Sequence, residues 1–78
     1  MTTLTDIHIL TVTAERAAER YNRRCRRMLA LYRAGRKPNE SCWNNTEAMR
    51  KTAEAARKDL DTAIMEQAMI ASMAQVNI

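Results

Sequence analysis

Few residues in this chain of 78 could form a catalytic or metal-binding site. His8 is its only imidazole, and its only thiols, Cys25 and Cys42, fall where a small apolar side chain would pack. No set of Cys and His has the spacing of a zinc site, and Asp59 and Asp61 would point to different sides of a helix. These residues do not supply a nucleophile, a base and an orienting group. We therefore expect no enzymatic activity, no bound metal and no cofactor.

Arginine is the residue type whose placement does suggest chemistry. Residues 16–37 hold nine basic side chains and one acid, Glu19, whereas residues 40–78 hold four basic and six acidic ones. On a helix, Arg16, Arg20, Arg23 and Arg27 form a row at steps of four, three and four, within about 60° of one another and opposite the apolar positions. Guanidinium groups pair well with phosphates and carboxylates, so the sequence predicts a face for an anion or an acidic partner. An alternative is a charged face that meets only water. The face comprises Arg16, Arg20, Arg23, Arg24, Arg27, Arg33, Arg36 and Lys37.

Two long stretches of helical periodicity position these side chains. Thr3 or Thr5 can cap the first helix, Gly35 follows its last periodic residue, and Pro38 suits the first turn of the second. We expect helices at about residues 5–34 and 39–74 with a turn at 35–38. This is an all-α fold, a single-domain antiparallel hairpin of two long helices. The first apolar stripe is Ile7, Leu10, Ala14, Ala17, Tyr21, Cys25, Met28 and Tyr32; the second is Cys42, Met49, Ala53, Ala56, Leu60, Ala63, Gln67, Ile70 and Ala74.

A competing interpretation concerns residues 7–13, which are rich in β-branched side chains and could form a strand. An isolated strand needs a partner, most easily the same strand of a second copy. The helical stripe runs through this segment without a break, which favours a helix.

Both ends of the chain carry apolar residues outside the stripes. Met65, Met69 and Met73 recur at steps of four and so share one face of the second helix. Earlier on that face, the pairs Glu47–Lys51 and Glu54–Lys58 are expected, so the face changes from charged to apolar along the helix. Ile9 and Val12 lie on the line that the arginines occupy later. An antiparallel hairpin brings these residues to one end. We expect that end to self-associate, giving a dimer that completes a four-helix bundle; docking of another protein is the alternative.

Trp43 follows a stripe position but points about 100° away from it. It can cover the edge of the seam between the helices, which is its structural role. Alternatively it anchors a partner or stacks on a base beside the basic residues.

Composition and charge suggest a cytoplasmic protein that works by binding. The net charge is +4. The first 13 residues contain no Lys or Arg, so they lack the basic segment of a signal peptide, and no apolar run is long enough to span a bilayer. We expect a small helical protein that occludes or bridges a macromolecular partner, either a host protein or a nucleoprotein complex. Size and class are typical of phage or mobile-element accessory inhibitors, anti-CRISPR-like or directed at a regulator. The alternative is a nucleic-acid-binding protein or small transcription regulator that uses the arginine face.

Overall fold

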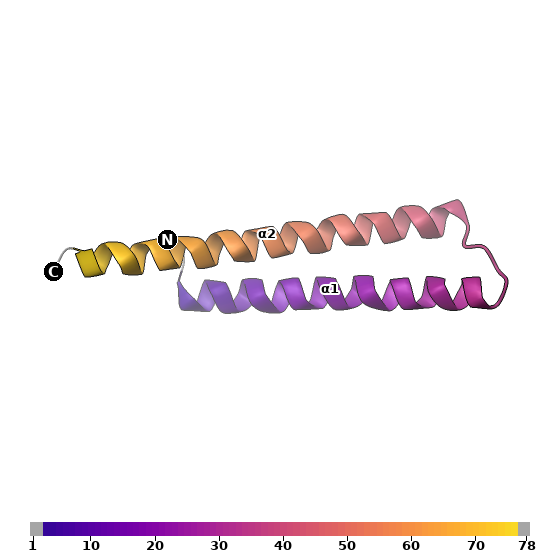
Figure 1. Ribbon diagram of the computed structural model, residues 1–78, viewed down its shortest axis with the longest axis horizontal. Helices are drawn as coiled ribbons and strands as arrows, with labels where there is room; N and C mark the ends of the chain where they lie inside the picture. Colours follow the sequence, from indigo (N-terminus) through magenta and orange to yellow (C-terminus); the bar gives the residue numbers. More distant parts are fainter. Residues whose placement is uncertain (1–2, 77–78) are drawn as a thin grey trace.

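Two helices form an antiparallel hairpin in the computed structural model, which describes residues 3–76 (Figure 1). Helix α1 covers Leu4–Arg33 and helix α2 covers Glu40–Val76. The hairpin measures 65 × 17 × 16 Å. The predicted all-α hairpin is confirmed, and residues 7–13 belong to α1, so the strand alternative is wrong. The longer α2 runs past the start of α1, which leaves its last turns without a neighbouring helix (Figure 1).

Helix α1 begins with a capping box. The side chain of Thr3 accepts a hydrogen bond from the Asp6 backbone N–H at 3.1 Å. The Asp6 carboxylate accepts one from the Thr3 backbone N–H at 3.0 Å. Thr3, rather than Thr5, is therefore the cap, and two backbone donors that a helix start leaves unpaired are satisfied.

Helix α1 ends where Gly35 adopts a left-handed conformation, with φ of 74°. The Gly35 N–H donates to the carbonyl of Tyr32 at 3.0 Å, and the Arg36 N–H donates to that of Leu31 at 2.9 Å. This pair of bonds is a Schellman motif, which stops a helix while satisfying its last carbonyls. Glycine suits the position because it adopts positive φ without a steric penalty.

Helix α2 starts two residues later than a proline at its first position would require. Asn39 is the cap, since its side-chain oxygen accepts a hydrogen bond from the Cys42 N–H at 2.8 Å. Pro38 precedes the cap and is buried, so its predicted place in the first turn is wrong. The proline instead packs at the turn and restricts the residue before it.

A thin seam of small side chains holds the helices together. Among the described residues, the buried apolar side chains are Ala14 and Met28 of α1 and Leu60 and Ala63 of α2. None of the larger side chains described is completely buried. Alanine lets the helix axes approach closely, but it contributes little apolar area. Such a core stabilises a monomer only modestly.

The seam departs from the expected stripes at both of its ends. Beside the turn, Leu31 is half-buried while Tyr32, the predicted stripe residue, is exposed. At the free ends, Ile70 and Ala74 are exposed because α2 extends beyond α1 there. The remaining stripe positions that were predicted are half-buried or buried in the structure.

A polar contact crosses the seam near the turn. The Thr46 hydroxyl is buried, donates to the Cys42 carbonyl at 2.7 Å and lies 2.9 Å from the Met28 sulfur. Cys25 and Cys42 are both free and half-buried.

Candidate functional site

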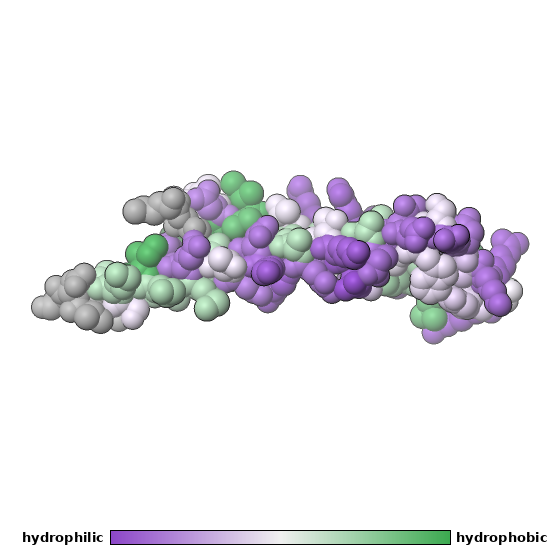
Figure 2. Space-filling model, turned by 90° about the horizontal axis from the view of Figure 1, so that it is seen from above, coloured by the Kyte–Doolittle hydropathy of each residue, from purple (hydrophilic) through white to green (hydrophobic). Residues whose placement is uncertain are grey.

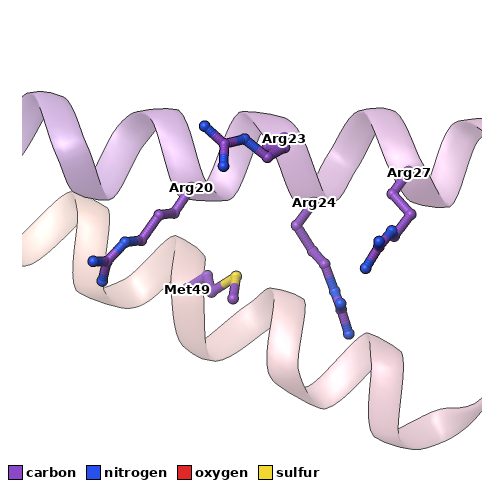
Figure 3. A pocket seen from close by; sticks show the side chains of 5 residues that line it. All are labelled: Arg20, Arg23, Arg24, Arg27 and Met49. Carbon is purple, nitrogen blue, oxygen red and sulfur yellow. The ribbon is translucent and has the colours of Figure 1, made fainter.

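A groove runs along one edge of the seam, toward the turn (Figure 3). It consists of two adjoining hollows of about 280 and 420 Å³ that share Arg20, Arg24 and Met49. We call this combined feature the arginine groove. It is lined by Ala17, Arg20, Arg23, Arg24 and Arg27 of α1 and by Asn45, Ala48, Met49 and Thr52 of α2.

The arginine side chains take different directions around the groove. Arg20 and Arg24 reach from α1 toward α2, with Met49 between them, while Arg23 stays close to α1 (Figure 3). Arg20 belongs to the row predicted to lie opposite the apolar stripe, yet its side chain reaches toward α2 (Figure 3). Small seam residues bring the helices close, so that long side chains flanking the seam of α1 extend over the neighbouring helix.

The groove is electrostatically one-sided because no carboxylate lines it. Arg23 forms an ion pair with Glu19, at 2.9 Å, and both side chains are largely exposed. Within residues 3–76, Arg20, Arg24 and Arg27 form no ion pair with a carboxylate. The Nε–H of Arg24 is buried and has no acceptor among the described residues. A guanidinium partly removed from water in this way favours an incoming anion.

The remaining members of the predicted basic face lie outside the groove. They extend the positive charge along α1 and around the turn, where each is exposed. Their positive charge can attract an anion from a distance, but these residues do not line the groove. These residues are Arg16, Arg33, Arg36 and Lys37.

The charged face of α2 is organised around an arginine that the sequence analysis did not single out. Arg50 pairs with Glu47 and, at 2.6 Å, with Glu54. Its hydrogen bonds lower the pKa of Glu47. The expected pairs of these glutamates with Lys51 and Lys58 are thus replaced by a bridge through one guanidinium. A planar group with several donors can hold two carboxylates, which a compact ammonium does less well.

Apolar side chains gather at the free ends of the hairpin (Figure 2). Met65, Met69 and Met73 are exposed by 61–65%, and Ile9 is exposed by 56%. Val12, in contrast, is half-buried and not exposed, so it contributes less to this surface than predicted. We call this surface the apolar end. It consists of Leu4, Ile9, Ile64, Met65, Met69, Ile70 and Met73.

Aromatic residues line a third hollow, of about 290 Å³, on the other edge of the seam. The rings of Trp43 and Tyr32 lie 6.2 Å apart at a tilt of 58°, and each residue is about half exposed. Tyr21 also lines this hollow, and its hydrogen bond with Cys25 raises the pKa of the phenol. Trp43 therefore covers the seam edge, with one face still open to a partner.

Sequence reasoning missed the residues that α2 contributes to the arginine groove. Met49 was assigned to the seam alone, while Asn45 and Thr52 were not assigned to a site. Their spacing of three and four residues places them on one flank of α2, which is the only signal that could have identified them.

Other sequence features contribute no additional site within the described residues. His8 is exposed, and no group of three or more His, Cys, Asp or Glu in this part of the chain could hold a metal ion. Neither helix, over the residues described, contains a stretch apolar enough to cross a bilayer. Comparisons with known protein families, curated proteins and solved structures found no match for this chain.

Proposed function

We propose that this is a non-enzymatic binding protein that pairs with a second copy of itself and occludes or bridges a macromolecular partner. In this proposal the apolar end joins the two copies. The turn end, with its arginine groove, contacts the partner. Accessory inhibitors that phages and mobile elements direct at host complexes would work in this way.

The observation that carries the proposal is the amount of surface the single chain exposes. Its accessible surface is 6462 Å² for a mass of 8.9 kDa. A compact monomer of that mass would expose about 4,800 Å². The excess, roughly 1,700 Å², is in the range that one subunit buries in an obligate homodimer.

The excess surface is of the kind that associates. The apolar end presents seven large apolar side chains, each exposed by 47% or more, on two helices that lie together. Large exposed apolar side chains gathered at one end of a small protein often mark a surface that contacts another protein. Methionine side chains also adapt to irregular surfaces, so a row of them packs readily against a second helical pair.

Pairing also explains how so small a chain could act on a larger complex. Each copy contributes one arginine groove, so a dimer carries two clusters of arginine side chains at fixed positions. It can therefore engage two anionic sites at once, or cover a surface larger than the hairpin alone.

The experiment that tests self-association is a mass measurement in solution by light scattering. We expect the wild type to have twice the mass of one chain, and Met69→Asp to reduce it to the mass of one. A carboxylate at that position would otherwise have to be buried in the interface. Ala55→Asp is the matched control, since it adds the same charge at an exposed position in the charged part of α2.

Two results would contradict the proposal. The first is a wild type with the mass of a single chain at micromolar concentration. The second is a Met69→Asp variant that keeps the mass of the wild type. Circular dichroism on each variant shows whether the helices remain formed, which separates dissociation from unfolding.

A further inference from the structure

We propose that the arginine groove binds the phosphodiester backbone of duplex nucleic acid without reading its sequence. This inference rests on the proposed function, because it names the chemistry of the partner that the turn end contacts. It has separate evidence, namely the lining of the groove and its position on the hairpin.

The lining of the groove selects for an extended anion. Four guanidinium groups line it without a carboxylate, and Asn45 and Thr52 add neutral groups that can donate hydrogen bonds. All four cations are arginines, whose forked donors match two oxygens of one phosphate. The buried Nε–H of Arg24 shows that the fold draws this charge partly out of water without giving it an acceptor.

The dimensions of the basic row fit a nucleic-acid backbone. Arg16 and Arg27 lie eleven residues apart on α1, which is about 16 Å at the rise of an α-helix. Phosphates follow one another about every 3.4 Å along the axis of each strand, so the row faces about five of them. The hairpin has a cross-section of 17 × 16 Å, whereas the major groove is about 12 Å wide. The hairpin is therefore too wide to enter the groove and lies along the backbone, where no base edge is read.

The distribution of aromatic residues favours a duplex over a single strand. Proteins that hold single strands usually stack bases on aromatic rings. Here Tyr21, Tyr32 and Trp43 line the hollow on the other edge of the seam, and no ring lines the arginine groove. A duplex needs no such platform, because its bases stay stacked on one another.

A phosphate backbone also fits this groove better than an acidic protein. A nucleic acid presents an unbroken row of anions in any sequence. A protein would have to place carboxylates at matching intervals over the same length, next to a groove that offers few apolar side chains beyond Met49. An acidic protein partner is therefore treated as an outcome that would overturn the inference.

The test measures fluorescence anisotropy of a labelled 24-base-pair DNA duplex of arbitrary sequence, titrated with the full chain at 50 and 200 mM NaCl. We expect binding to weaken roughly 150-fold between these salt concentrations, as for about four phosphate contacts. Replacing the duplex sequence with another should leave the affinity unchanged within about twofold, because only backbone contacts are made.

Paired charge reversals locate the binding surface. Arg20→Glu with Arg24→Glu changes two groove residues, and we expect it to reduce affinity by at least about tenfold. The control combines Arg26→Glu with Arg33→Glu, two exposed arginines of the same helix. They lie about 160–180° around α1 from Arg24 and make the same change of net charge. We expect the control pair to lose much less affinity than the groove pair.

Each remaining outcome has a definite meaning. Equal losses in the two double variants, or no duplex binding by the wild type at 50 mM NaCl, would overturn the inference. So would groove-dependent binding of polyglutamate in preference to the duplex, which would indicate an acidic protein. A dimer that fails to bind the duplex leaves the proposed self-association intact. A monomer that binds it through the groove refutes self-association and retains the groove.

Discussion

The half of the hairpin beside the turn and the half that carries the free ends share one seam but differ on their outer faces. Beside the turn, the exposed surface is rich in arginine, and the groove that arginines line contains no carboxylate. At the free ends, the exposed surface includes seven large methionine, isoleucine and leucine side chains. Water solvates the first surface well, whereas the second is stabilised by contact with another apolar surface.

The two halves also differ in how the backbone is held. At the turn, a Schellman motif and an asparagine cap close both helix ends within a few residues, and Pro38 is buried. At the free ends, α1 relies on its capping box, and the last turns of α2 have no helix beside them. The turn half therefore closes within one chain, while the free-end half leaves the last turns of α2 uncovered.

The largest expected loss of stability comes from a substitution in the seam that the two halves share. Leu60→Ala removes a side chain that is 5% exposed and should cost about 2–5 kcal/mol. For a chain of this length the whole stability is roughly 4–12 kcal/mol. Thermal unfolding followed by circular dichroism should therefore shift strongly. Leu29→Ala is the matched control, because Leu29 is 49% exposed and beside the turn, and it should cost less than about 1 kcal/mol. Equal losses would show that the half-exposed surface beside the turn is also buried in the functional assembly.

A smaller effect tests whether the turn is as self-contained as the comparison implies. Gly35→Ala places a β-carbon on a residue with φ of 74°, which should cost about 1–2 kcal/mol. Nothing lies within 4 Å of that β-carbon, so the cost comes from the backbone alone. Gly35→Asn should lose less, because asparagine tolerates this conformation better. Chemical denaturation ranks the three proteins, and an alanine variant as stable as the wild type would contradict the argument.

The helices and their pairing were predictable because they depend on local spacing. Apolar residues at three- and four-residue steps assign one face of each helix, and a single glycine marks the turn. The Glu19–Arg23 pair was predictable for the same reason, since both residues belong to one helix. These features need no knowledge of how one helix is rotated against the other.

The arginine groove was only partly predictable because it depends on that rotation. The sequence places Arg20 and Arg24 on α1, but not at the edge where Met49 approaches from α2. A seam of alanines permits several rotations at similar cost, so periodicity alone cannot choose among them. The bridge through Arg50 escaped prediction for a related reason. Whether Glu47 and Glu54 pair with Arg50 or with Lys51 and Lys58 depends on side-chain geometry and not on spacing.

The smallest effect concerns the start of α1, where the free-end half is held by its capping box. Hydrogen bonds from the backbone N–H and then the side chain of Thr3 lower the pKa of Asp6 below its ordinary value of 3.8. A lowered pKa means that the carboxylate form stabilises the fold. The contribution is therefore complete above pH 3.8 and is lost as the pH falls through the folded pKa.

Side-chain NMR should show Asp6 titrating below its ordinary value, while amide exchange in the first turn of α1 accelerates over the same pH range. Asp6→Asn removes the titrating group and should abolish that pH dependence, while Thr5→Ala leaves it unchanged because Thr5 makes no capping bond. Exchange that accelerates equally at the cap of α2, where Asn39 does not titrate, would attribute the effect to general acid destabilisation instead. A local response would instead show that the free end of α1 is held by its cap and not by the seam.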